Sequence, residues 1–360
     1  MVGVKGEGMY KNILIINLMY IGDLLFITPL LRTLRTNFPK AHIALLADEK
    51  NTAVIKYNQH LSELIPIDKK GYHNKFPNFM GLIFDIRKRK FDLVINLHAN
   101  ERASVIAALS GGQKIIGFSA KGFGIFLDNL IKERTDIHQV DAYLEVLKAI
   151  NVTTIDNQGL EMWVDVATEG RATTIWDTAY CHCEPREAIF PLHADTPKVI
   201  GINTGGSWPT KRWTKAGFSQ LADKLLEKGY GIAFFGGPMD EKDVNDIISL
   251  MKYQHHNKLV VFTGKTTLLE MATLVKKCAV LVTGDSGPMH IAVAQQVPVV
   301  AIFGPSDPIR YAPYQQENHV MQRGCPCQPC GKHKCDIGHV CMEEITVEMV
   351  LAKLGDLQIE

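Results

Sequence analysis

The 360-residue sequence lacks any apolar run close to the roughly 20 residues that a membrane-spanning helix needs. The stretch from Ile13 to Leu31 superficially resembles a signal-peptide core, but Asp23 interrupts it and it has no small-x-small cleavage pattern. We therefore interpret it as a buried strand followed by the start of a helix. With neither a signal nor a span, the protein is expected to be cytoplasmic.

An excess of charge of one sign is also lacking, because the formal net charge is +1. This balance disfavours a nucleic-acid partner, since neutralising phosphates requires a concentrated basic face. Two short basic runs, Lys69-Lys70 and Arg87-Lys88-Arg89-Lys90, are candidates for contacting a phosphorylated acceptor or the anionic lipids of the inner membrane face. A solvated surface is the simpler explanation of both runs.

A nucleotide-hydrolysing P-loop is excluded as well. Gly264-Lys265-Thr266 imitates the end of that motif, but Leu259 occupies the position of its first glycine. We expect Thr266 or Thr267 to cap a helix that starts at Leu268.

What the sequence does contain is an alternation of apolar runs with amphipathic stretches, in both halves of the chain. The expected strands are 12–18, 42–47, 63–67, 92–97, 198–204, 231–236, 258–264, 279–284 and 298–304. The expected helices are 29–39, 79–89, 216–229, 268–278 and 345–355. Continuously apolar strands alternating with helices predict an α/β fold with parallel sheets covered on both faces.

The length and the 46% of hydrophobic residues allow two domains. We place the first domain at 1–185, a proline-containing linker at 186–197, the second domain at 198–344 and a C-terminal helix at 345–360. Each domain opens with a strand that runs into a glycine turn. We therefore expect two doubly wound, Rossmann-like domains that face each other across a ligand-binding cleft.

The segment 282–303 is the most informative one, because it reads as strand, glycine-rich turn, helix and strand. Asp285 lies in the turn, and Ser286, Gly287 and His290 open the helix. Free N–H groups at a helix start attract phosphate, while a carboxylate is better suited to sugar hydroxyls beside that phosphate. A nucleotide-sugar site is our first hypothesis, and simple helix capping by Asp285 or Ser286 is the alternative.

A second candidate loop follows the strand at 198–204. Thr204, Gly205, Gly206 and Ser207 combine hydroxyls with glycines that can approach phosphate, and Lys211 adds a positive charge nearby. The alternative is that the lysine and its neighbour are a solvated basic pair.

Three further acids follow expected strands. Asp23 is a candidate general base or sugar ligand, or else caps a helix over 24–37. Asp240 and Glu241 are candidates for binding ribose hydroxyls, or cap a helix over 240–251.

Five cysteines lie within seventeen residues, in the segment 325–341. The spacing of Cys327, Cys330, Cys335 and Cys341 is typical of a four-thiolate metal site that has no open position. Zinc and iron both suit thiolate ligands. His333 and His339 are alternative ligands, Cys325 is left over, and reduced free thiols are the other explanation. We expect a structural metal that braces the C-terminal region and takes no part in the chemistry.

Together these segments resemble glycosyltransferase family 9, the ADP-heptose:lipopolysaccharide heptosyltransferases. The resemblance is carried, in family order, by YIGDLLFITPLLRTLR, INTGGSWPTKRWT, VTGDSGPMHIAVA and VAIFGPSDP. It implies a GT-B fold, with the acceptor on the first domain and the nucleotide sugar on the second. It also implies an inverting, metal-independent transfer of heptose from ADP-L-glycero-D-manno-heptose to a lipopolysaccharide core or related acceptor.

The resemblance implies roles for single residues. Asp23 corresponds to the catalytic base, Lys211 to the lysine near the donor phosphates, Asp285 to the acid that holds the heptose, and Thr204 to the phosphate loop. The cysteine segment CPCQPCGKHKCDIGHVCM departs from the core enzymes. It is similar to the four-cysteine insertion of heptosyltransferases that modify autotransporter proteins, in which a bound iron is structural.

That departure leaves three acceptors open, namely a lipid A core sugar, another glycan or a protein side chain. Two rival classes also remain. An epimerase of the same architecture would convert the nucleotide sugar without any acceptor. A binding module would take up the donor without turnover.

Overall fold

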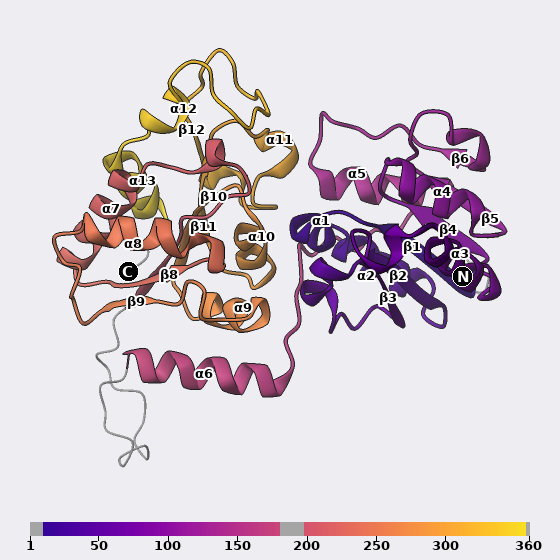
Figure 1. Ribbon diagram of the computed structural model, residues 1–360, viewed down its shortest axis with the longest axis horizontal. Coiled ribbons are helices and arrows are strands. Elements are labelled where there is room, and N and C mark those ends of the chain that lie inside the picture. Colours follow the sequence, from indigo (N-terminus) through magenta and orange to yellow (C-terminus); the bar gives the residue numbers. More distant parts are fainter. Residues whose placement is uncertain (1–9, 181–197, 358–360) are drawn as a thin grey trace, which may run out of the picture. The chain divides into compact units, whose positions relative to one another are not determined.

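A computed structural model of the protein describes residues 10–180 and 198–357. The chain divides into two compact units, Met1–Trp163 and Val164–Glu360. Figure 1 shows that helices cover both faces of the sheet in each unit. This is the α/β architecture that the sequence predicts.

The first unit is built on a six-stranded parallel sheet in the order β3-β2-β1-β4-β5-β6. Its strands are β1 (Asn12–Asn17), β2 (His42–Asp48), β3 (Glu63–Ile67), β4 (Leu93–Asn96), β5 (Lys114–Gly117) and β6 (Asn129–Leu130). Its α-helices are α1 (Ile21–Phe26), α2 (Thr28–Asn37), α3 (Phe76–Lys88), α4 (Glu101–Leu109) and α5 (Gln139–Glu145). Five of the six residues of β1 are buried, as expected of a strand covered on both faces.

The second unit repeats this plan, with the order β12-β11-β10-β7-β8-β9. Its strands are β7 (Val199–Asn203), β8 (Gly231–Phe235), β9 (Leu259–Val261), β10 (Val280–Gly284), β11 (Val299–Phe303) and β12 (Val320–Gln322). Its α-helices are α6 (Val166–Tyr180), α7 (Lys215–Glu227), α8 (Glu241–Ser249), α9 (Leu268–Lys276), α10 (Gly287–Ala294), α11 (Pro308–Tyr311), α12 (Val340–Glu343) and α13 (Val347–Asp356). In Figure 1, α7, α8 and α13 cover one face of this sheet, and α9 and α10 cover the other.

The described residues also contain short 3-10 helices. They are η1 (Glu49–Ile55), η2 (Tyr72–Asn74), η3 (Gly124–Phe126), η4 (Val146–Ile150), η5 (Pro209–Lys211), η6 (Pro238–Asp240) and η7 (Glu317–His319). Lys211 is the last residue of η5.

Local signals fix the starts of two helices, and the threonine cap of α9 is predicted from the sequence. The hydroxyl of Thr267 accepts a hydrogen bond from the N–H of Glu270, whose side chain accepts one from the N–H of Thr267 in return. Thr346 caps α13 in a similar way, by accepting the N–H of Met349.

The sequence allowed a continuous helix over 24–37, but the structure has two shorter helices there. The chain forms α1 and α2 with Ile27 between them. The reason is Pro29, which has no N–H to donate and is tolerated only in the first turn of a new helix. The strand expected over 258–264 is also shorter, because Gly264 already turns the chain with φ +72°.

The boundary between the units lies earlier than the expected domain end at 185, because α6 packs on the second unit. The ring of Trp176 stacks on Phe262 with 6.1 Å between the centroids, and the Tyr180 hydroxyl donates to the carbonyl of Ile232 at 2.9 Å. The expected linker 186–197 lies outside the described residues.

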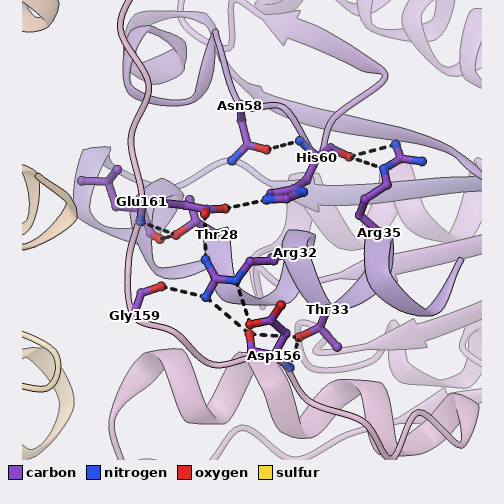
Figure 2. A network of polar contacts seen from close by, with 10 residues as sticks. Thr28, Arg32, Thr33, Arg35, Asn58, His60, Asp156, Gly159 and Glu161 are labelled. Carbon is purple, nitrogen blue, oxygen red and sulfur yellow. Dashed lines mark hydrogen bonds and ion pairs between the residues drawn. The ribbon is translucent and has the colours of Figure 1, made fainter. Parts of the chain in front are cut away.

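The end of the first unit is fixed to α2 by a polar network, shown in Figure 2. The Arg32 guanidinium lies 3.0 Å from Asp156 Oδ1 and 2.7 Å from Glu161 Oε2, and it also donates to the carbonyl of Gly159 at 3.1 Å. His60 contacts the other oxygen of Glu161 at 3.1 Å. A guanidinium with several acceptors holds an irregular segment in one place, and this one leads directly to the unit boundary.

Side chains from both basic runs of the first unit have partners within that unit. The Lys69 ammonium donates to the carbonyl of Leu18 at 2.7 Å and pairs with Asp48 at 2.9 Å. Arg89 pairs with Glu63, and Arg87 donates to the carbonyl of Leu109. Within residues 10–180 and 198–357, no helix is long and apolar enough to cross a bilayer.

Candidate active site

In both units, the candidate residues lie where the winding of the sheet reverses. Parallel sheets bind ligands beyond the carboxyl ends of their strands, at the point where successive connections leave in opposite directions. The strand orders place that point between β1 and β4 in the first unit and between β7 and β10 in the second. Asp23 follows β1, whereas Thr204 follows β7 and Asp285 follows β10.

Asp23 is held in the first turn of α1. Its Oδ2 accepts the N–H of Tyr20 at 3.3 Å, and its Oδ1 lies 3.4 Å from the hydroxyl of Tyr143, which donates to it from α5. Asp23 is therefore the N3 residue of α1 and not its N-cap. Only 8% of its surface is exposed.

The environment of Asp23 changes its acidity. Burial is the largest effect and raises the pKa of the carboxyl group from 3.8 to about 6, against the opposing hydrogen bonds from Tyr20 and Tyr143. A carboxylate with a pKa close to neutral accepts a proton more readily than an ordinary one, as a general base must.

In the second unit, the Thr204 loop is fixed by its neighbours. The side-chain amide of Asn203 donates to the hydroxyls of Thr283 at 2.8 Å and Ser286 at 3.0 Å, which joins the ends of β7 and β10. A Cβ atom on Gly205 would lie 2.8 Å from Asp240 Oδ2, so a larger residue here would displace the Asp240 carboxylate. The buried hydroxyl of Thr204 has no hydrogen-bond partner among the described residues.

Lys211 and Asp285 form a direct ion pair at this edge. Lys211 Nζ lies 2.5 Å from Asp285 Oδ2, and both side chains are largely buried. The ammonium also lies 4.4 Å from the centre of the Trp208 ring, a cation–π contact. A Cβ atom on Gly284 would lie 2.8 Å from the Lys211 carbonyl, so the end of β10 and the loop are in close contact.

Ser286, Gly287 and His290 lie at the start of α10, as predicted. Ser286 is the N-cap residue, but its hydroxyl makes no capping bond and instead contacts Asn203 and Thr283. Simple capping therefore does not explain this turn. His290 is buried, with 4% of its surface exposed.

Asp240 and Glu241 have different surroundings. Asp240 accepts the N–H of Gly237 at 2.9 Å and lies 3.6 Å from Arg212, beside the Thr204 loop. Asp240 is the N-cap residue of α8, but its side chain makes no capping hydrogen bond to that helix. The alternative that Asp240 serves as a simple side-chain cap is therefore wrong. Glu241 instead lines a cavity of about 270 Å³, whose wall also includes Thr263. The buried hydroxyl of Thr263 finds no hydrogen-bond partner in the described part of the chain.

Three residues at the site were not predicted from the sequence. Tyr143 contacts Asp23 from 120 residues away, and no local pattern marks it. His98 follows β4 at the reversal point of the first sheet, and its position after an apolar run was the signal that could have found it. Burial, followed by the charge of Lys69, lowers the pKa of His98 to about 4, so its imidazole is neutral. Trp208 lies in the loop before Lys211, but their contact needed the structure.

The cysteine segment surrounds a small cavity. Cys327, Cys330, Cys335 and Cys341 all line a space of about 90 Å³. Burial, followed by the charges of the other cysteines, raises the pKa of Cys341 to about 11. Within the described residues, however, no group of three or more His, Cys, Asp or Glu side chains is arranged to hold a metal ion.

Two doubly wound parallel sheets, each with polar residues at its reversal point, are the architecture of the GT-B class of glycosyltransferases. Residues 80–341 match the sequence profile of Glycosyltransferase family 9 (heptosyltransferase). The chain belongs to this family and is a glycosyltransferase.

Similar proteins agree with this assignment. Lipopolysaccharide heptosyltransferase 2 of Escherichia coli K12 is 25% identical over 97% of this chain and 99% of its own length. The crystal structure of a glycosyl transferase family 9 protein from Veillonella parvula has a TM-score of 0.83 and 33% identity, and covers 97% of both chains. E. coli heptosyltransferase WaaC with ADP-2-deoxy-2-fluoro heptose has a TM-score of 0.69 and 16% identity, over 96% of this chain and 99% of that one.

A more distant structural neighbour contains iron. The dodecameric iron-containing heptosyltransferase TibC, in complex with ADP-D-beta-D-heptose, has a TM-score of 0.57 and 13% identity. It covers 97% of this chain and 76% of TibC. At that identity the likeness extends to the fold alone.

Proposed function

We propose that this protein is an inverting glycosyltransferase that moves a heptose from ADP-L-glycero-D-manno-heptose to a hydroxyl of a lipopolysaccharide core. The observation that carries the proposal is the Lys211–Asp285 pair at the reversal point of a family 9 chain. Beside it lies the buried Thr204 hydroxyl, for which the described residues offer no hydrogen-bond partner. The names of the relatives support heptose as the sugar and lipopolysaccharide as the acceptor.

Lys211 and Asp285 would bind different parts of the donor. The Lys211 ammonium is suited to the diphosphate, and the Thr204 hydroxyl can donate to a phosphate oxygen. Asp285 is repelled by phosphate but can accept hydrogen bonds from the heptose hydroxyls. Donor binding would then replace the 2.5 Å ion pair with one partner for each charge.

The nucleoside would extend toward α8. Asp240 lies beside the Thr204 loop, and Glu241 lines the adjacent cavity of about 270 Å³. Carboxylates at such strand ends bind ribose hydroxyls in doubly wound folds. We assign the cavity to the nucleoside and keep both Asp240 and Glu241 as candidate ligands of the ribose hydroxyls.

Asp23 would be the base. The acceptor hydroxyl attacks the anomeric carbon and gives its proton to the Asp23 carboxylate, while ADP departs from the opposite face of the sugar. Lys211 and the N–H groups at the start of α10 would stabilise the charge that develops on the leaving diphosphate. These groups supply the positive charge that a divalent cation would otherwise provide. His98 lies at the same sheet edge as Asp23 and is a candidate contact for the acceptor.

The cysteine segment would hold a structural zinc or iron ion through Cys327, Cys330, Cys335 and Cys341. Their shared cavity supports this proposal, although the four thiols would have to move closer together around the ion.

The decisive experiment incubates the protein with ADP-heptose and a core oligosaccharide that lacks heptose, and follows product mass and ADP release. We expect a product heavier by one heptose with an inverted anomeric centre. ADP-heptose, but not a UDP- or GDP-sugar, should raise the melting temperature by mass action. Conversion of the donor without acceptor would indicate an epimerase, and binding without any turnover would indicate a binding module.

A further inference from the structure

The cysteine-rich segment, residues 323–341, is bonded directly to the 3-10 turn that carries Lys211. Thr210 is held on two sides, because its hydroxyl donates to the carbonyl of Lys332 at 2.7 Å and its own carbonyl lies 2.6 Å from His339 Nε2. A carbonyl can only accept, so His339 must carry a proton on Nε2 and donate it. Thr210 is buried, with 6% of its surface exposed.

A second contact runs through aromatic rings. The Trp208 indole stacks on the His333 imidazole, with 3.8 Å between the ring centroids. The same indole contacts the Lys211 ammonium, which lies 4.4 Å from the ring centre. His333 therefore supports the ring on which the charge of Lys211 rests.

The same segment also holds the loop after β11. The N–H of Gly331 donates to the carbonyl of Pro305 at 2.9 Å, and the Gln328 side chain donates to the carbonyl of Gly304 at 2.7 Å. A Cβ atom on Gly304 would lie 3.1 Å from the Thr210 carbonyl, so this loop packs closely against the turn that precedes Lys211.

We infer that the cysteine-rich segment is a positioning element of the donor site, and that it acts through Trp208 and Thr210 on Lys211. The turn from Pro209 to Lys211 is a single 3-10 turn, so its conformation depends on what it contacts. This inference rests on the proposed role of Lys211 with the donor diphosphate. It departs from the expectation that the cysteine segment leaves the chemistry alone.

The first test removes one bond at a time and measures ADP affinity by calorimetry. His339 has φ +59°, so His339→Gly removes the imidazole without backbone strain, whereas His339→Gln returns an N–H donor. We expect His339→Gly to weaken ADP binding by roughly 3- to 10-fold, the effect of one lost hydrogen bond, and His339→Gln to recover part of it. Lys334→Ala, at an exposed position of the same segment, is the matched control and should bind ADP normally.

The second test needs no variant. Coupling between two sites is reciprocal, so a segment that positions the donor loop must itself be stabilised by the donor. Cys327 is exposed and open to an alkylating reagent. Saturating ADP should slow the alkylation of the segment cysteines in the wild-type protein several-fold.

The outcomes separate this inference from the function on which it rests. If Lys211→Ala binds ADP as tightly as the wild type, the proposed donor role fails and the inference fails with it. If Lys211→Ala weakens ADP binding while His339→Gly does not, only the inference is overturned. Alkylation rates that ADP leaves unchanged would overturn it as well, even if His339→Gly does not fold.

Discussion

The ammonium of Lys211 lies 2.5 Å from the carboxylate of Asp285, although 74 residues separate them in the chain. Each charge thus has a partner before any donor arrives. In a largely buried place an unpaired charge is costly, so the pair keeps the loop after β7 and the turn after β10 in contact. A donor that offers a diphosphate and sugar hydroxyls can replace both halves of the pair at once.

The first prediction separates the two halves. Lys211→Ala should weaken binding of plain ADP, because the diphosphate loses its positive partner. Asp285→Ala should leave ADP binding undiminished and weaken only ADP-heptose, because the sugar loses its acceptor. Calorimetry with both ligands measures this division. Lys215→Ala is the control, since Lys215 pairs with Asp243 and Asp246 instead. Equal losses of ADP affinity in the two variants would contradict it.

The second prediction concerns Asp23. Asp23→Asn should lower turnover by roughly 10²–10⁴, the usual effect of removing a positioned base, and should keep ADP affinity. Turnover and ADP binding are measured on the same preparation, so that misfolding is recognised. Near-normal turnover would remove Asp23 from the mechanism.

The same substitution should stabilise the protein above neutral pH. The folded pKa of Asp23 is raised from 3.8 to about 6, so its contribution to stability is present below pH 3.8 and is lost as the pH rises through about 6. The asparagine stays neutral, and the gain could reach about 3 kcal/mol at pH 8. Denaturant unfolding at pH 5 and pH 8 should show a smaller gain at the lower pH. A gain that does not depend on pH would argue against a destabilised carboxylate.

A third prediction follows from the Tyr143 hydroxyl. The base must be ionised, so kcat/KM should fall as the pH drops below about 6. The hydroxyl lowers the pKa of Asp23, so Tyr143→Phe should raise that pKa and move the acid limb to higher pH. Tyr180→Phe removes a hydroxyl that bonds to Ile232 in the second unit and should leave the limb in place. An unmoved limb in Tyr143→Phe would mean that Tyr143 only packs against the site.

The fold class and most strands could be predicted because their signals are local, whereas β5, β6, β12, α4, α5 and α6 were not among the expected elements. Strands buried on both faces are continuously apolar, and Thr267 and Thr346 mark the starts of their helices through bonds only three residues long. The unit boundary could not be placed in this way. No local pattern in α6 indicates that Trp176 stacks on Phe262, so the sequence alone does not assign this helix to the second unit.

The candidate site shows the same division. The residues that follow strands, such as Asp23, Thr204 and Asp285, are visible in the sequence because parallel strands end at one edge. Residues that contact the site from distant parts of the chain cannot be identified from the sequence. The contact of Tyr143 with Asp23 and the stack of His333 on Trp208 join segments more than 100 residues apart, and no spacing rule connects them.

The last prediction concerns the metal. The segment 323–339 contains few large apolar residues and forms neither strand nor helix, so it cannot build a core of its own. A thiolate-bound ion would supply that missing core, because site formation and local folding are coupled. Protein purified without chelator should therefore contain about one zinc or iron ion per chain by elemental analysis. Cys330→Ser should lose the ion and lower the melting temperature, whereas Cys325→Ser, which removes the left-over cysteine, should keep both. Metal-free protein in which all five clustered thiols react freely in the native state would show that the cysteines are simply reduced. In that case the hydrogen bonds to Thr210, Gly304 and Pro305 would be what holds the segment in place.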